Sequence, residues 1–130
     1  MTDSELISLA KNASALAYAP YSGYNVGAAI ECEGGEVFTG CNIESAAYGS
    51  TICAERCAVS NAIAHGRRDF IRIAVYANGD DYCVPCGNCR QVLYEFAPEM
   101  PVLCAKGNGE YMTVPLSDLL PHGFNKTYLT

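Results

Sequence analysis

Positive charge and histidine are both scarce in this sequence. Lys and Arg together number 8 against 14 Asp and Glu, so the formal net charge is −6 over 130 residues. Phosphate backbones and anionic membrane surfaces attract the opposite charge. We therefore expect no nucleic-acid partner and no membrane partner, and an uncharged or cationic small molecule suits the chain better. The two histidines, His65 and His122, are interpreted as a helix-end residue and a loop residue, and neither is assigned to a metal.

Long apolar runs are also missing. No stretch approaches the roughly 18 apolar residues that a membrane-spanning helix needs. Residues 1–5 are polar and partly acidic, whereas a secretion signal begins with a basic segment that leads into an apolar one. We therefore expect a cytoplasmic protein. In that compartment thiols stay reduced, and clustered cysteines usually indicate a metal site or catalysis.

The remaining composition is that of an ordinary globular protein. Hydrophobic residues make up 50% of the chain and charged residues 17%, which argues against intrinsic disorder. A chain of this length fits one domain. We predict a single domain over residues 1–130.

The hydrophobic pattern alternates between helical and strand periods. Apolar residues at three- and four-residue spacing predict a helix over residues 4–18, with Thr2 and Glu5 as a capping box and Pro20 after its end. Further helices are predicted at 53–64, 86–96 and 115–120, and strands at 25–30, 37–39, 70–77, 102–105 and 111–114. Pro85 is placed at the first helical position, and Gly34 with Gly35 predicts a tight hairpin turn.

The order of these elements predicts the fold class. Helices interleaved with strands favour a mixed five-stranded sheet covered by helices, which is a three-layer α/β/α domain. The connection at residues 106–110 is too short for a parallel crossover. The last two strands are therefore expected to pair antiparallel.

Two short segments carry the residues suited to chemistry: Cys-Ala-Glu-Arg at 53–56 and Pro-Cys-Gly-Asn-Cys-Arg-Gln at 85–91. Each opens a predicted helix, where the partial positive charge of the helix N-terminus stabilises thiolates. Three thiolates, from Cys53, Cys86 and Cys89, leave the fourth tetrahedral position of a zinc ion for water, as in catalytic zinc sites. Zinc lowers the pKa of that water toward ~7, and Glu55 projects beside the metal as a base.

A positive side chain stands next to this group. Three thiolates and one Zn²⁺ carry a net charge of −1, which weakens the metal as a Lewis acid. Arg56 lies in the first helical turn with Cys53, and we expect it to donate to the thiolates and offset this charge.

The paired motifs resemble the cytidine deaminases of free-nucleoside salvage, in their small three-cysteine form. The resemblance runs along nearly the whole chain and includes residues 20–22, 26–29, 40–44, 46–48 and 119–121. It implies a cytidine-deaminase-like fold and hydrolysis of cytidine and 2′-deoxycytidine to uridine and 2′-deoxyuridine. By this resemblance Cys53, Cys86 and Cys89 would bind one zinc ion per subunit. Glu55 would move protons between water, ring N3 and the leaving amino group.

The resemblance also implies a set of substrate contacts. Asn42 and Glu44 match the ribose-binding pair of the family, and the backbone of Ala54 would contact the pyrimidine. Tyr24 falls where the family usually has a Phe that stacks near the base. Tyr48 and Phe124 match positions that reach into the site of a neighbouring subunit, which implies a homotetramer with shared active sites.

The sequence departs from the family pattern at three places. Tyr24 adds a hydroxyl, Asn88 replaces the small Ala usual between the paired cysteines, and residues 82–84 form a distinctive approach to Pro85. None of these changes removes a catalytic group. They leave the substrate preference open.

Structural interpretations remain beside the chemical ones. Cys83 with the three other cysteines would make a closed structural zinc site, and residues 86–89 match a C-x-x-C redox motif. Asn42 and Glu44 also suit turn formation, and the three aromatic residues suit packing. The alternative functions are deamination of a related cytosine nucleoside, deamination of cytosine in nucleic acid, and a non-catalytic structural-zinc module.

Overall fold

A mixed five-stranded sheet forms the centre of the molecule in the computed structural model, which describes residues 1–129. Its strands are β1 (Val26–Cys32), β2 (Val37–Cys41), β3 (Phe70–Ala77), β4 (Pro101–Ala105) and β5 (Tyr111–Pro115). The spatial order is β2-β1-β3-β4-β5. Strands β3 and β4 pair in parallel, whereas the pairs β1–β2, β1–β3 and β4–β5 are antiparallel. The predicted mixed sheet and the predicted antiparallel pairing of its last two strands are confirmed.

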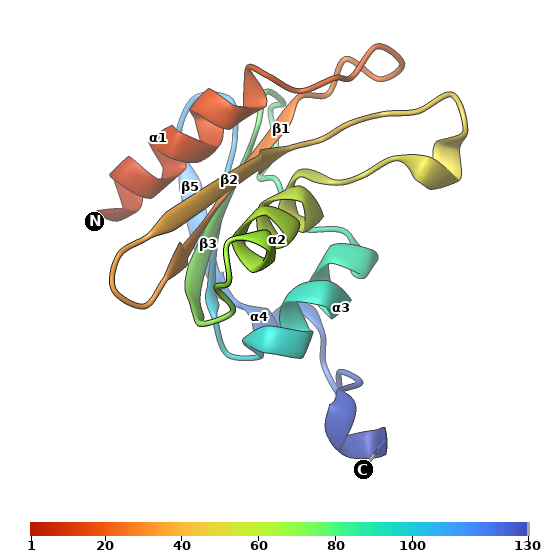
Figure 1. The fold of residues 1–130 in the computed structure, drawn as a ribbon. Helices are drawn as coiled ribbons and strands as arrows, with labels where there is room; N and C mark the ends of the chain where they lie inside the picture. Colours follow the sequence, from red (N-terminus) through yellow and green to blue (C-terminus); the bar gives the residue numbers. More distant parts are fainter. Residues whose placement is uncertain (130) are drawn as a thin grey trace.

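Helices cover both faces of the sheet (Figure 1). The α-helices are α1 (Asp3–Ser14), α2 (Ala54–Ala64), α3 (Gly87–Phe96) and α4 (Leu116–Leu119), and 3₁₀ turns occur at Tyr48–Ser50 and Lys126–Leu129. Helix α1 lies on one face, whereas α2, α3 and α4 lie on the other. This is the predicted three-layer arrangement. None of the helices among residues 1–129 is long and apolar enough to cross a membrane.

The central strands are buried on both faces, and successive side chains divide between two hydrophobic clusters. The cluster facing α2 and α3 includes Ala28, Ile30, Ile73, Val75 and Val102. The cluster facing α1 includes Ala29, Ala74, Tyr76, Leu103 and Ala105. This alternation is the two-residue period of a strand. It explains why β3 reads as a nearly continuous apolar run.

Two glycines allow helices to approach the sheet closely. A Cβ atom on Gly27 of β1 would lie 1.9 Å from the carbonyl oxygen of Ala10 in α1. A Cβ atom on Gly40 of β2 would lie 2.4 Å from the backbone nitrogen of Ala58 in α2. Both distances are far shorter than any real contact. Gly40 therefore determines how close α2, which carries Cys53 at its N-cap, lies to the sheet.

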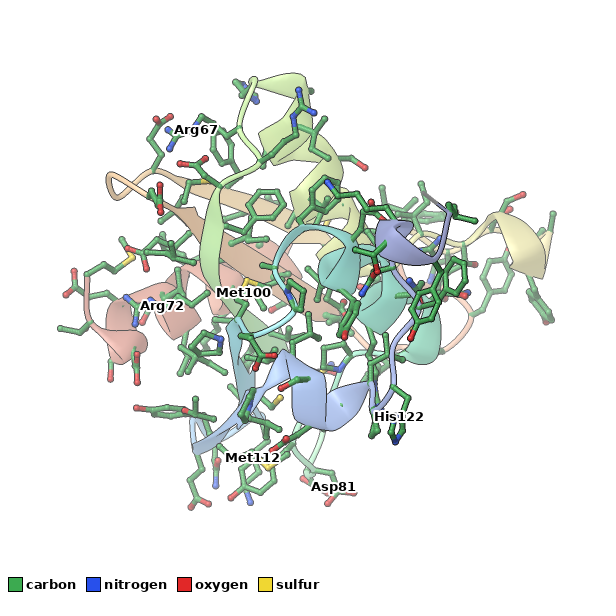
Figure 2. All side chains as sticks on the ribbon, turned by 90° about the horizontal axis from the view of Figure 1, so that it is seen from below. Arg67, Arg72, Asp81, Met100, Met112 and His122 are labelled. Atoms are coloured by element: carbon green, nitrogen blue, oxygen red, sulfur yellow. The ribbon has the colours of Figure 1, made fainter. Side chains whose placement is uncertain are left out.

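Two arginines, Arg67 and Arg72 (labelled in Figure 2), form ion pairs between different elements of the fold. Arg72 on β3 donates to the buried Glu31 at 2.5 Å and also pairs with Asp3 at the start of α1. Arg67, between α2 and β3, pairs with Glu36 of the β1–β2 hairpin. The apolar run of β3 can contain Arg72 because the carboxylates of Glu31 and Asp3 pair with its charge.

Two local predictions are wrong. Helix α1 ends at Ser14 rather than at residue 18, because the Tyr18 backbone N–H donates to Asn42 O at 3.0 Å and Tyr18 forms a bridge with Ile43. Pro85 is not the first helical residue, because Cys86 is the N-cap of α3 with extended dihedral angles. The predicted Thr2–Glu5 capping box is confirmed.

We expect the substitution Gly27→Ala to lower the free energy of unfolding by about 2 kcal/mol or more, because overpacking a tight contact costs ~1–3 kcal/mol. Urea denaturation followed by circular dichroism measures the change. Gly49→Ala is the matched control, because a Cβ atom there meets no atom within 4 Å. Equal stability of the two variants would contradict the close packing of α1 on β1.

Candidate metal and catalytic site

The N-termini of two helices meet on the same face of the sheet. Cys53 is the N-cap of α2 and Cys86 is the N-cap of α3, and neither side chain caps its own helix. Cys89 follows in the first turn of α3 and is buried. Unpaired N–H groups and the helix dipole at both ends favour negative charge at this position. The two motifs of the sequence are thus brought together by the fold.

The three thiols form a cluster with the dimensions of a tetrahedral zinc site. The sulfur atoms of Cys53, Cys86 and Cys89 all lie within 4.8 Å of one another, and Cys53 Sγ lies 3.6 Å from Cys86 Sγ. Zn–S bonds of about 2.3 Å in tetrahedral geometry place two sulfurs about 3.8 Å apart. Within residues 1–129 the cluster contains these three cysteines and not Cys83. This donor set fits zinc and contains no fourth protein sulfur.

Hydrogen bonds polarise the sulfur atoms. The thiol of Cys89 donates to Cys53, and this bond, supported by Arg56, lowers the pKa of Cys53 to about 5 although burial opposes the shift. The same shared hydrogen bond, together with burial, raises the pKa of the donor Cys89. The two thiols therefore titrate as a pair, and their neighbours favour a thiolate at Cys53.

Arg56 reaches the cluster from the first turn of α2. Its Nη2 donates to Thr51 O at 3.2 Å and to Cys53 Sγ at 3.8 Å. Its Nε is buried and has no hydrogen-bond partner among the described residues. The hydrogen bond to Cys53 Sγ and the charge of that sulfur raise the pKa of the guanidinium, although burial opposes the shift. Arg56 is thus a fixed positive charge beside the thiols.

Glu55 is a buried carboxyl group beside the same cluster. Only 4% of its surface is exposed. Burial raises the pKa of Glu55 to about 7, and the negative charge of Cys53 adds to this shift, whereas hydrogen bonds from its own backbone N–H and from Cys89 oppose it. A carboxyl group with a pKa close to neutrality both accepts and releases protons readily at physiological pH.

A cavity of about 200 Å³ opens onto Glu55 and the thiols. Its lining includes Tyr24, Asn42, Cys53, Ala54, Glu55 and Cys86. The remaining walls come from apolar side chains and Thr51. An apolar pocket with a few convergent polar groups is typical of a small-molecule site. Tyr24, Asn42 and Ala54 therefore line the same cavity as Glu55.

Glu44 lies in an adjoining cavity of about 350 Å³, with Tyr21, Ser22 and Tyr48. Thr51 lines both cavities. The Glu44 carboxylate accepts hydrogen bonds from Tyr21 N at 3.0 Å, from Ser22 N at 3.2 Å and from Ser22 Oγ at 2.5 Å. These bonds, the one from the Ser22 side chain first, lower the pKa of Glu44. The Glu44 carboxylate thus holds residues 21 and 22, which are distant in the sequence, and its lowered pKa favours the ionised form.

The Asn42 side chain is also engaged with the backbone. Its Oδ1 accepts from Val26 N at 2.9 Å and its Nδ2 donates to Tyr24 O at 2.9 Å. A primary amide has two N–H donors. The bond to Tyr24 O accounts for one of them.

The two remaining aromatic candidates do not line the cavity of Glu55. The Tyr48 side chain is 79% exposed and contacts Tyr21 edge-on, with ring centroids 6.3 Å apart. Phe124 is half exposed and stacks on Tyr128 near the C-terminus. His122 lies in the loop after α4 (Figure 2), and the thiol cluster found among residues 1–129 does not include it.

Comparison with known proteins identifies the relatives of this arrangement. The family model described as "Cytidine and deoxycytidylate deaminase zinc-binding region" matches residues 1–105. The chain belongs to this family. The cytidine deaminase of Sporosarcina psychrophila is 42% identical over 127 residues, which cover 97% of this chain and 93% of that protein. The cytidine deaminase of Halalkalibacterium halodurans is 45% identical over 109 residues, or 83% of each chain.

A solved structure of the family has the same fold. The crystal structure of cytidine deaminase from Burkholderia pseudomallei superposes with a TM-score of 0.92 at 44% sequence identity. The match covers 95% of this chain and all of that one. The resemblance inferred from the two motifs is therefore confirmed at the level of family and fold.

Several residues around the two cavities were not predicted as site residues. Thr51 and Cys83 line the cavity, and Ser22 anchors Glu44. Arg90 donates to Pro85 O at 2.6 Å and to Leu119 O at 2.9 Å, so it braces the turn that precedes Cys86. Arg90 directly follows Cys89 in the motif, Ser22 lies in a segment that carries the resemblance, and Cys83 was considered only as a fourth zinc ligand.

We expect the pKa values of Glu55 and Glu44 to be shifted in opposite directions from the ordinary glutamate value. In protein prepared without metal, burial should keep Glu55 protonated below about pH 7, as its raised pKa requires. The titration midpoint of Glu44 should lie below the ordinary glutamate pKa of about 4.3, because its hydrogen bonds favour the charged form. Side-chain ¹³C NMR over a pH series measures both midpoints, with Glu55→Gln and Glu44→Gln as assignment controls. A Glu55 midpoint below that of Glu44 would contradict this account.

Proposed function

We propose that this chain hydrolyses the amino group of free cytidine and 2′-deoxycytidine, which gives uridine or 2′-deoxyuridine and ammonia in cytoplasmic pyrimidine salvage. The observation that carries this proposal is a buried carboxyl group, Glu55, beside three convergent thiols in a cavity. Support also comes from relatives named cytidine deaminase at 42% and 45% identity. All eight cysteines are free, which suits a reducing compartment.

The proposed chemistry needs one zinc ion per chain, held by Cys53, Cys86 and Cys89. When bound, zinc would polarise a water molecule toward hydroxide at neutral pH. Glu55 would take a proton from this water and deliver protons to ring N3 and then to the leaving amino group. The pKa of about 7 for Glu55 suits both directions of transfer.

The substrate would lie across the two adjoining cavities. The pyrimidine would sit in the cavity of Glu55, against Tyr24 and the backbone of Ala54, and the ribose would extend past Thr51. The side-chain amide of Asn42 and the carboxylate of Glu44 would then bind ribose hydroxyls. An ionised Glu44 beside the sugar repels phosphate, which favours a free nucleoside over a nucleic acid.

We further propose that residues 1–130 act as one domain within a homotetramer. Tyr48 and Phe124 are large apolar side chains left 79% and 52% exposed. Contact with the site of a neighbouring subunit would bury them. The exposure supports this assignment because exposed aromatic side chains are enriched in protein interfaces.

A colorimetric or absorbance assay tests the activity. The purified protein should convert cytidine to uridine, and Glu55→Gln should lower kcat by roughly 10²–10⁴-fold because the proton carrier is lost. Glu95→Gln, an exposed carboxyl on α3, is the control and should keep full activity. Zinc content, measured by mass spectrometry, should be one ion per chain in all three proteins.

Each alternative function has its own outcome in this assay. A zinc-loaded but inactive wild type would favour a structural module. Faster turnover of an oligonucleotide would favour a nucleic-acid substrate, and faster turnover of a modified cytosine nucleoside would favour a related nucleoside. Any of these results would overturn the proposed substrate.

We also infer that Arg56 offsets the charge of the three thiolates. Its contact with Cys53 Sγ at 3.8 Å and its raised pKa support this role. Arg56→Ala should weaken zinc binding by about 10–100-fold, as removal of groups that support metal ligands does, and should shift the pH–rate profile. Chelator competition measures the zinc affinity, with exposed Arg68→Ala as the control. Unchanged affinity together with an unchanged pH–rate profile would refute this role.

A further inference from the structure

Tyr24 is an aromatic residue that lines the cavity. Its backbone forms hydrogen bonds with side chains and does not belong to a strand or a helix. Its N–H donates to Ser22 Oγ at 3.0 Å, and its carbonyl accepts from Asn42 Nδ2 at 2.9 Å. Ser22 is itself held by Glu44. Residues from the loop after β2 thus fix one side of the Tyr24 segment.

The other side of this segment is held by Asn78, which directly follows β3. Asn78 Nδ2 donates to Gly23 O at 3.3 Å, and Asn78 Oδ1 accepts from Asn25 N at 3.1 Å. One amide therefore bridges the residues before and after Tyr24. A single side chain that bonds both neighbours restricts the orientation of the residue between them.

Gly79 makes room for the Tyr24 ring. A Cβ atom on Gly79 would lie 3.1 Å from Tyr24 Cε1 and 3.9 Å from Cδ1, and it would meet no atom outside this ring within 4 Å. The φ angle of Gly79 lies outside the left-handed region, so its backbone accepts an alanine. The Tyr24 ring can therefore occupy its position because residue 79 has no Cβ atom.

The Tyr24 ring faces the cavity together with Cys83. Partial burial and the neighbouring Cys83 raise the pKa of Tyr24 to about 12. The hydroxyl is therefore neutral at physiological pH. A shift of this ring away from Gly79 would change the shape of the cavity at the wall that Tyr24 forms.

We propose that Asn78 and Gly79 form a cradle that positions Tyr24 and thereby sets the affinity of the cavity for the nucleobase. They are positioning residues, because they act through Tyr24 and do not line the cavity. This inference rests on the proposed function, since it takes a nucleoside as the ligand. It extends the site to a turn beyond the two cysteine motifs.

Steady-state kinetics on the zinc-loaded enzyme with cytidine test the cradle. Gly79→Ala should raise KM by roughly tenfold and leave kcat within about twofold, the pattern expected when substrate binding is perturbed but the chemical step is not. Asn78→Ala should act in the same direction. Asp80→Ala, an exposed position in the same turn, should leave both constants unchanged.

A double-mutant cycle separates the cradle from a general loss of stability. In a Tyr24→Ala background the ring is gone, so Gly79→Ala should have no further effect on KM. Additive effects of the two substitutions would overturn the inference. An unchanged KM in the Gly79→Ala single variant would overturn it as well.

A second readout does not depend on turnover. In ¹³C NMR spectra of the tyrosine rings, Gly79→Ala should move the Tyr24 ε resonance, whereas Asp80→Ala should not. An unmoved resonance would refute the cradle. If the wild type fails to convert cytidine, the proposed substrate falls, and the NMR arm still decides whether Gly79 positions Tyr24.

Discussion

The site depends on the close approach of two helix N-termini over one face of the sheet. Helix α2 can begin there because Gly40 has no side chain to hold it off β2. Helix α3 begins beside it because Arg90 holds the Pro85 carbonyl and the end of α4 together. The sulfur atoms of Cys53, Cys86 and Cys89 then lie within 4.8 Å of one another. Without this convergence the two motifs would be separate helix ends with ordinary thiols.

Burial gives two glutamates different chemistry within adjoining cavities. Glu55 has lost water and has its pKa raised to about 7, whereas Glu44 keeps three hydrogen bonds to its charged form and has a lowered pKa. Environment rather than residue type therefore separates the pKa values of the two carboxyl groups. This contrast supports the proposed division between a reacting base at Glu55 and a sugar toward Glu44.

Several polar side chains near the cavity form hydrogen bonds with the backbone around Tyr24. Asn42 forms hydrogen bonds with both Val26 N and Tyr24 O, and it lines the cavity of Glu55. Ser22 joins Glu44 to Tyr24, and Asn78 holds the residues on either side of Tyr24. The loop before β1 is thereby ordered without regular secondary structure. A rigid aromatic wall costs less entropy on ligand binding than a mobile one.

Local spacing determined much of this protein in advance. The strand periods, the antiparallel β4–β5 pair, the capping box and the two motifs at helix starts were all predicted, because each depends on residues close together in the chain. The end of α1 was not predicted correctly, because Tyr18 bonds with residues 42 and 43 and does not continue the helix. The same holds for Pro85, whose carbonyl is taken by Arg90.

Only the tertiary structure decided how the predicted groups are shared between cavities. It placed Cys83 at the cavity wall outside the thiol cluster, separated Glu44 from Glu55, and put Gly79 under the ring of Tyr24. These relations depend on contacts between separate segments of the chain, such as the turn after β3 and the loop before β1. They follow from how close the chain segments pack, and no spacing within either segment carries that information.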